Sequence, residues 1–236
     1  MKFRAGGSIA ASAVIILLLF ALSLGGGRQF YDSAEVFGYE NCRTRRTLVL
    51  DAGHGGADGG AVSITGRCES EINIEIVQKI ADLSAFYGID PVLTRKSEEI
   101  DYPDDAKTIK SKKVADQRAR VALVNALDDP FFISIHQNKF STSGARGAQV
   151  FYGSGDESKY FAEFAQGMLC KLDEGNSRPA EKIPPSVYLM KNITCPAVLF
   201  ECGFLSNPTE AALLETQEYQ LKLAALITGA YVSYTQ

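Results

Sequence analysis

The stretch Leu48-Val49-Leu50-Asp51-Ala52-Gly53-His54-Gly55-Gly56 joins a short apolar run to a glycine-rich loop. A short apolar run bounded by turn residues is typical of a buried strand in an α/β sheet. The glycines allow a sharp turn directly after the strand, and no lysine follows them as it does in a phosphate-binding loop. The stretch therefore predicts a first strand over residues 46–52 whose carboxyl end presents His54.

Two further apolar runs end in a residue that can do chemistry. Phe131–His136 ends in the second of the chain's two histidines, and Pro196–Glu201 ends in a carboxylate. Ligands bind outside the carboxyl ends of the strands in such sheets, so His54, His136 and Glu201 are expected at one edge. Two histidines and a carboxylate with one open position are a pattern of catalytic zinc sites.

The third ligand can be drawn from the segment that opens the first predicted helix. Judged by residue type alone, the candidates for the third metal ligand are Glu69, Glu71 and Cys68, and none of them is strongly preferred. A carboxylate at the N-terminus of a helix can equally cap the helix or interact favourably with its dipole. Glu201 is a stronger candidate for function, because a carboxylate that closes a buried strand is costly unless it is paired, metal-bound or catalytic. Strand alternation then predicts that Cys202 faces the opposite way and packs in the core.

Strands alternate with helices along the rest of the chain. This order predicts a single α/β domain with a twisted, mostly parallel sheet of about six strands and helices on both faces. The candidate zinc site is expected at the carboxyl edge of the strands. Strands are predicted over residues 46–52, 91–94, 131–136, 147–152, 187–190 and 197–201. Helices are predicted over residues 69–87, 114–127, 159–172, 209–214 and 219–234, and loops over 96–112 and 174–185.

The N-terminus differs from the rest in composition. Lys2 and Arg4 precede an uncharged apolar stretch, Ser8–Leu24, that is as short as a membrane span can be and also fits a signal peptide. The absence of a good cleavage site after it favours an uncleaved signal anchor, with the N-terminus in the cytoplasm. The domain is therefore expected to be exported, either membrane-anchored or secreted. The predicted organisation is 1–27 signal anchor or signal peptide, 28–44 linker and 45–236 catalytic domain.

Charge and cysteine content narrow the possible partners. The net charge is -4, so the chain has no basic field that would attract nucleic acid. Five cysteines are an odd number and form no dense disulfide framework, which favours mostly buried free thiols.

Several motifs stand in the order found in one enzyme family. From about residue 48 onward the chain resembles the zinc-dependent N-acetylmuramoyl-L-alanine amidases of the amidase 3 type. The resemblance rests on Asp51–Ala61, Gly66–Asn73, Thr94-Arg95, Ser134–Asn138 and Pro196–Asn207.

The resemblance implies a role for each candidate residue. It implies zinc held by His54, Glu69 and His136, with Glu201 as the catalytic carboxylate. The family's E-x-x-x-N motif matches Glu69 and Asn73, and so selects Glu69 over Glu71. The implied reaction is hydrolysis of the amide that joins the lactyl group of N-acetylmuramic acid to L-Ala in peptidoglycan.

Three further residues lie in family-like blocks. Arg95, Arg120 and Asn138 can orient the substrate or the groups around the zinc, or they can make structural hydrogen bonds beneath the site. The sequence leaves both interpretations open.

Within the family, the chain looks most like the short, germination-type spore-cortex amidases. It has an apolar N-terminal segment, one catalytic domain and subgroup-like blocks at 111–118 and 147–152. This likeness implies action on cortex muropeptides from the forespore intermembrane space, in preparation for muramic-δ-lactam formation. A regulatory partner protein is possible. The alternatives are a general cell-wall autolysin amidase, a zinc carboxypeptidase acting on wall peptides, and a wall-binding domain without catalysis.

Overall fold

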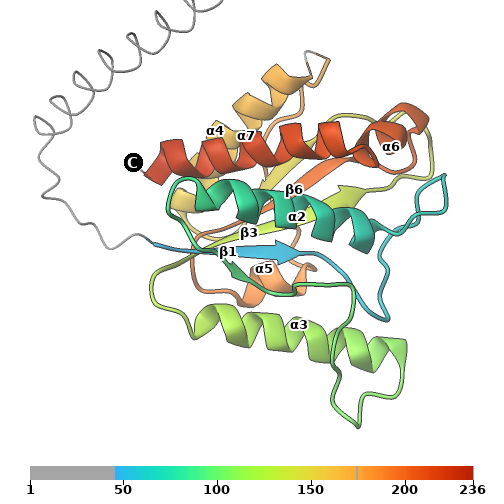
Figure 1. Cartoon of the computed structure of the whole chain (residues 1–236), viewed down its shortest axis with the longest axis vertical. Coiled ribbons are helices and arrows are strands. Elements are labelled where there is room, and N and C mark those ends of the chain that lie inside the picture. Colours follow the sequence, from blue (N-terminus) through green and yellow to red (C-terminus); the bar gives the residue numbers. More distant parts are fainter. Residues whose placement is uncertain (1–45, 174, 236) are drawn as a thin grey trace, which may run out of the picture. The chain divides into compact units, whose positions relative to one another are not determined.

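A computed structural model describes residues 46–173 and 175–235 of the chain (Figure 1). The predicted N-terminal segment, 1–27, and the linker, 28–44, lie outside these residues. No helix within the described part is both long and apolar enough to cross a membrane.

A six-stranded sheet forms the centre of the domain, in the order β2-β1-β3-β6-β4-β5. All neighbouring strands are parallel except β4 and β6, which are antiparallel. This confirms the predicted α/β class and the mostly parallel sheet. The strands are β1 (Thr47–Ala52), β2 (Val92–Leu93), β3 (Pro130–Asn138), β4 (Gln149–Tyr152), β5 (Glu181–Lys182) and β6 (Ala197–Phe204).

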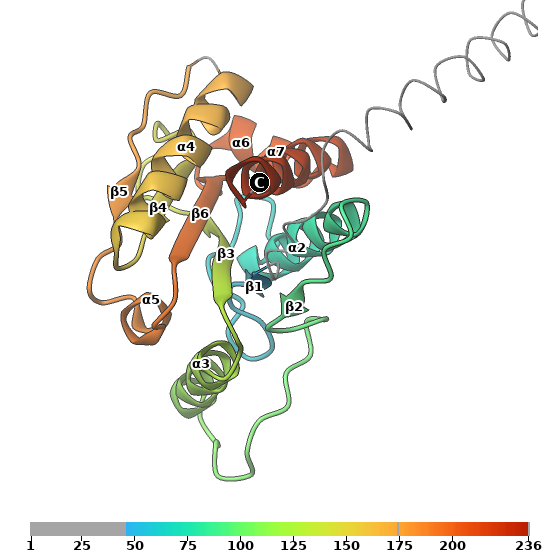
Figure 2. The same ribbon diagram turned by 90° about the vertical axis from the view of Figure 1, so that its left-hand side faces the viewer.

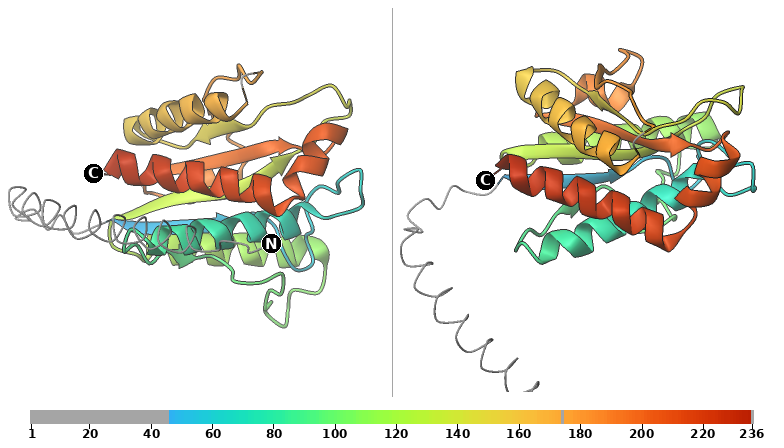
Figure 3. Two further views of the ribbon diagram at one scale, coloured as in Figure 1. Left: turned by 45° about the horizontal axis from the view of Figure 1, so that its top comes forward. Right: turned by 90° about the horizontal axis from the view of Figure 1, so that it is seen from above.

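Helices cover both faces of this sheet, as Figure 2 shows. Helices α2, α4 and α7 pack on one face, with α7 between the other two (Figure 3), and α3 and α5 lie on the opposite face. The helices are α2 (Glu69–Ala85), α3 (Ile109–Asn125), α4 (Asp156–Leu172), α5 (Tyr188–Asn192), α6 (Pro208–Leu214) and α7 (Gln217–Thr235).

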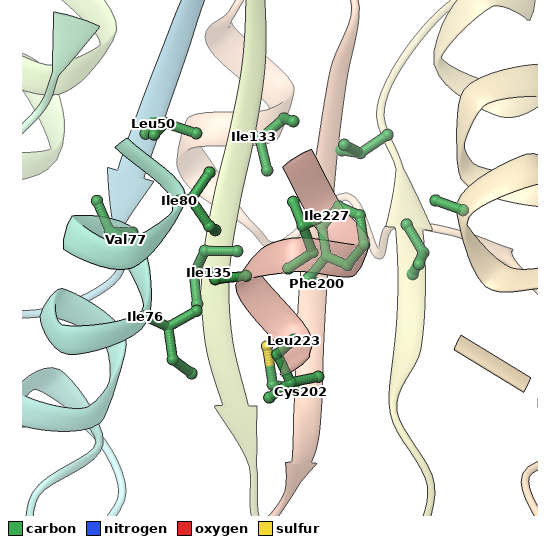
Figure 4. Packing of buried hydrophobic residues seen from close by; sticks show 14 of the residues in the cluster. Leu50, Ile76, Val77, Ile80, Ile133, Ile135, Phe200, Cys202, Leu223 and Ile227 are labelled. Atoms are coloured by element: carbon green, nitrogen blue, oxygen red, sulfur yellow. The ribbon is translucent and has the colours of Figure 1, made fainter. Parts of the chain in front are cut away.

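Strand alternation divides the core into two clusters. In β1, Leu48 and Leu50 belong to the larger cluster under α2, α4 and α7, whereas Val49 belongs to the smaller cluster under α3 and α5. Figure 4 shows the larger cluster, in which Ile76 of α2 and Leu223 of α7 pack with side chains of β3 and β6. The strands bury apolar side chains on both faces of the sheet. Polar side chains that can bind a ligand are therefore expected near the strand ends.

Two predicted elements are wrong, and several begin earlier than predicted, most clearly helix α3. Residues 187–190 form no strand, because Tyr188–Asn192 is helix α5; a short apolar run does not distinguish the two structures. The sixth strand is instead β5, which lies inside the predicted loop 174–185. Helix α3 begins at Ile109 and not at residue 114, because the Thr108 side chain accepts a hydrogen bond from Ser111 N and caps the helix there.

The direction of the strands decides which residues meet. Strands β1, β3 and β6 end at one edge of the sheet, and β4 begins at that edge because it runs antiparallel to β6. In the register, His136 of β3 lies opposite Glu201 of β6, and Glu201 lies opposite Gln149 of β4. These three positions therefore form a row across the sheet, at the edge where β1, β3 and β6 end.

Candidate metal centre and active site

The loop after β1 brings His54 over the edge of the sheet. His54 has a φ of 61°, in the left-handed region that side chains rarely adopt. Two glycines make room for the ligands around it. A Cβ on Gly53 would overlap the imidazole of His136, and one on Gly60 would lie 2.6 Å from Glu69 Oε2. The glycine-rich loop thus allows close approach of backbone and ligand side chains.

Three side chains converge beneath this loop. His54, Glu69 and His136 each offer a ligand atom, and these atoms lie within 4.8 Å of one another. His136 Nδ1 is 2.9 Å from Glu69 Oε1, and His54 Nε2 is 3.4 Å from Glu69 Oε2. Two imidazoles and one carboxylate with an open side fit the donor set of a catalytic zinc ion.

Glu69 is fixed in its ionised form. The backbone N–H groups of Ala61 and Gln137 donate to its two carboxylate oxygens at 2.9 and 3.1 Å. Burial opposes ionisation, but hydrogen bonds with His136 and His54 outweigh it and hold the pKa of Glu69 well below its usual value. A buried carboxylate that stays charged is suited to a cation.

The other two candidates for the third ligand lie outside the cluster. Glu71 is half-exposed, accepts a hydrogen bond from Cys68 N at 3.2 Å and lies 3.6 Å from Arg67 Nε. It therefore caps helix α2, the structural alternative considered for one of the two glutamates. Cys68 is the N-cap residue of α2 and does not belong to the His-Glu-His group. The four cysteines in the described residues are free thiols, as expected, but the expectation that most are buried is wrong for them, because only Cys202 is buried.

Glu201 lies beside the cluster on the neighbouring strand. Its residue pairs with His136 in the register, and the adjacent Cys202 packs into the opposite core cluster, as alternation predicted. Its Oε2 atom is buried and makes no hydrogen bond with the residues that the structure describes. Burial raises the pKa of Glu201 to about 7, with an opposing effect of His136 and a smaller raising effect of Glu69. A carboxyl group with a pKa near neutrality can both take and give a proton.

Arg95 and Arg120 bind backbone carbonyls of the loop that follows β1. Both are buried, and both donate to Ala52 O, at 2.9 and 2.7 Å. Arg95 also donates to Gly53 O at 3.2 Å, and Arg120 to His54 O at 2.6 Å. For these two residues the structure favours positioning of the loop over contact with substrate. The backbone carbonyl of Asn138 accepts a hydrogen bond from Leu205 N at 2.8 Å, and the register between β3 and β6 shifts between His136 and Asn138.

The structure gives a role to two carboxylates of the block Asp51–Ala61 to which the sequence analysis assigned none. Asp58 Oδ2 lies 3.0 Å from His54 Nδ1 and 2.8 Å from Lys113 Nζ, so it orients the ring of a candidate ligand. Asp51 is fully buried and pairs with Arg120 at 2.9 Å. Its place as the one charged residue of an apolar strand could have marked it. Asp58 is marked by its place in the family-like block Asp51–Ala61 and by no other sequence signal.

A cavity of about 80 Å³ adjoins the cluster on the face covered by α3 and α5. His54 and His136 contribute to its wall, Lys113 and Gln117 of α3 line one side, and Leu189 of α5 lines another. The cluster is therefore open to a space with both polar and apolar walls.

A single α/β domain with a His-Glu-His cluster and a neighbouring carboxylate at its strand ends has the arrangement of single-metal hydrolases. Residues 48–231 match a family model described as N-acetylmuramoyl-L-alanine amidase. The chain belongs to this family of enzymes, which confirms the resemblance seen in the sequence motifs.

Similar proteins place the chain within the family. The germination-specific N-acetylmuramoyl-L-alanine amidase of Bacillus subtilis (strain 168) is 37% identical over 191 residues, which cover 80% of this chain and 79% of that protein. The solved structure of the CwlD amidase from Clostridioides difficile, in complex with the GerS lipoprotein, has a TM-score of 0.76 and 35% identity. It covers 80% of this chain and 98% of that one. An N-acetylmuramoyl-L-alanine amidase from Clostridium difficile 630 has a TM-score of 0.69 and 28% identity, covering 80% and 96% of the two chains.

Proposed function

We propose that this protein hydrolyses the amide between N-acetylmuramic acid and L-Ala in peptidoglycan, with one zinc ion held by His54, Glu69 and His136. The observation that carries the proposal is the convergence of these three ligand atoms within 4.8 Å, next to a carboxylate with a buried, unbonded oxygen. When bound, zinc supplies Lewis acidity, which polarises a carbonyl and lowers the pKa of water toward about 7.

The chain's own residues supply the proton transfers and the positioning. Glu201 takes a proton from the attacking water and later gives it to the leaving amine of L-Ala. Asp58 accepts a hydrogen bond from His54 Nδ1, which leaves Nε2 directed at the metal position. Arg95 and Arg120 hold the carbonyls of the loop, and so keep His54 in its left-handed conformation.

Metal analysis tests the ligand assignment. His54→Ala and His136→Ala are each expected to lose most of the zinc that the wild-type protein retains after dialysis. Lys191→Ala, in an exposed part of α5, is a control that should retain it. Full zinc occupancy in either histidine variant would contradict the assignment.

We propose further that the substrate is spore-cortex peptidoglycan. The support is the 37% identity to a germination-specific amidase over 80% of this chain and 79% of that protein. Removal of the stem peptide exposes a bare muramic acid, which can then be deacetylated and closed to muramic-δ-lactam. A strain without this protein should divide normally but form spores that lack the lactam and fail late in germination. Chained vegetative cells with normal lactam content would favour a general autolysin instead.

The place of action is proposed to be outside the cytoplasm, in the forespore intermembrane space, with residues 1–27 as a signal anchor or signal peptide. The uncharged stretch Ser8–Leu24 behind two basic residues supports this proposal. The full chain should fractionate with membranes if the segment is an anchor, and lose its first residues if the segment is cleaved. Because a similar amidase was solved in complex with a lipoprotein, we propose a lipoprotein as the class of regulatory partner.

A further inference from the structure

Arg178 lies at the same edge of the sheet as the candidate active site, in the segment that precedes β5. Its Nη1 donates to Gln149 Oε1 at 3.2 Å, and Gln149 is the β4 residue opposite Glu201 in the register. The side chains of Gln149 and Glu201 share one face of the sheet, because Val150 and Phe200 belong to the core cluster on the other face. The row that begins with His136 and Glu201 therefore continues through Gln149 to a guanidinium group.

Several contacts hold this guanidinium in one place. Arg178 Nε donates to Arg146 O at 2.8 Å, and Cζ lies 4.7 Å from the centre of the Phe204 ring at the end of β6. The backbone is fixed as well, since Arg178 N donates to the buried Asn176 at 3.1 Å and Gln149 Nε2 donates to Pro179 O at 3.0 Å. The cation is thus preorganised and partly exposed.

These contacts use only two of the five guanidinium N–H groups. Arg178 forms no ion pair with a carboxylate among the described residues, whereas its neighbour Arg146 pairs with Asp173 at 3.1 Å. Both N–H groups of Nη2 and one of Nη1 make no hydrogen bond within the described part of the chain. A fixed guanidinium with three free donors matches the planar geometry of a carboxylate.

We propose that Arg178 binds a carboxylate of the stem peptide on the leaving-group side of the scissile amide. The proposal rests on the amidase function proposed above. Neighbouring strands lie about 4.8 Å apart, so a group one hydrogen bond beyond Gln149 is on the order of 8 Å from Glu201. The α-carboxylate carbon of the residue after L-Ala is six bonds from the scissile carbonyl carbon, roughly 7 Å when extended. This spacing assigns Arg178 to the carboxylate of the second stem residue.

A pair of matched substrates tests this assignment. Two N-acetylmuramoyl peptides that differ only in a free or an amidated α-carboxylate at the second residue are incubated with the zinc-loaded full chain. The wild-type kcat/KM should be roughly ten- to hundredfold higher for the free carboxylate, mainly through KM. Arg178→Ala should abolish this preference while cleaving the amidated substrate at nearly the wild-type rate, and Arg178→Lys should keep part of it.

Arg146→Ala is the control, because it removes an exposed cation from the same rim that is already paired with Asp173. It should retain the preference. An equal loss of activity on both substrates in Arg178→Ala, or an unchanged preference, would overturn the assignment of Arg178 and leave the amidase function standing. Failure of the wild-type protein to release peptide from either substrate would overturn the amidase function, and this inference with it.

Discussion

Glu69 is buried and Glu201 is partly buried at the same sheet edge, and their surroundings shift their pKa values in opposite directions. Glu69 accepts hydrogen bonds from two backbone N–H groups and lies 2.9 and 3.4 Å from ring nitrogens of His136 and His54, and these surroundings favour its charged form. Glu201 has a buried oxygen without a hydrogen bond, and its pKa is raised to about 7. The two surroundings therefore give the two carboxylates different roles: Glu69 stays charged as a candidate metal ligand, and Glu201 can exchange protons.

The separation of roles predicts the behaviour of Glu201→Gln. The variant should retain zinc, because Glu201 is not one of the three grouped ligands. Peptide release should fall by about 10²–10⁴-fold, since the amide cannot accept the proton of water. Metal content and turnover are measured on the same preparation. Release at nearly the wild-type rate would contradict the proton-transfer role.

A matched pair of substitutions distinguishes the two glutamates that open α2. Glu69→Gln should strongly reduce zinc retention, because it removes the buried carboxylate that both histidines contact. Glu71→Gln alters only a half-exposed cap and should change zinc retention little, with a stability loss of about 1 kcal/mol or less. Both variants are dialysed and assayed for metal. The reverse order would show that the proposed ligand is the wrong residue.

At the scale of the elements, a buried ion pair joins β1 to α3. Asp51 forms an ion pair with Arg120 at 2.9 Å. It also accepts hydrogen bonds from the hydroxyl groups of Ser134 and Thr94, at 2.6 Å each. Arg120 then reaches the carbonyl of His54 in the loop. The pair therefore ties the helix, two strands and the candidate ligand loop into one unit.

Breaking this pair should be costly. Asp51→Asn leaves the buried Arg120 with Asp116 as its one remaining countercharge among the described residues, and the free energy of unfolding should fall by about 3 kcal/mol. Asp173→Asn is the control, because it breaks the exposed pair with Arg146 and should cost about 1 kcal/mol or less. Urea unfolding followed by circular dichroism measures both variants. Equal losses would mean that Asp51 is no more important than a surface charge.

The same pair predicts a dependence of stability on pH. Burial opposes ionisation of Asp51, but Arg120 and the two hydroxyl groups lower its pKa below the usual value. The contribution of the pair is therefore complete above the pKa of an unfolded aspartate, about 3.9, and is lost as the pH falls through the lower folded value. Unfolding free energy measured across this range should fall more steeply in the wild-type protein than in Asp51→Asn. Parallel curves would contradict the assigned direction of the shift.

Elements with strong sequence patterns were predictable, and short ones were not. The runs that end in His54, His136 and Glu201 gave the right strands and the right edge, because buried parallel strands are continuous apolar segments. Strand β5 has only two residues, Glu181 and Lys182, both exposed, so no pattern marks it. The contacts of Asp58 and Arg178 were equally hidden, because they depend on how loops fold back on the sheet and not on spacing along the chain.

At the scale of the whole molecule, the fold of the described domain brings the residues proposed for metal binding and proton transfer to one edge of the sheet. The candidate ligands come from the loop after β1, from α2 and from β3, and the proposed proton-transfer residue comes from β6. The three candidate ligands and the proposed proton-transfer residue thus all belong to the described domain, although they lie far apart in the sequence.

The product of the reaction tests the central claim most directly. The zinc-loaded full chain is incubated with purified peptidoglycan fragments that carry stem peptides, and the products are identified by mass spectrometry. The account predicts glycan with unsubstituted muramic acid, together with peptides that begin with a free L-Ala amine. Stem peptides shortened at their carboxyl end would indicate a carboxypeptidase, and unchanged fragments a protein without catalysis; either result would contradict the account.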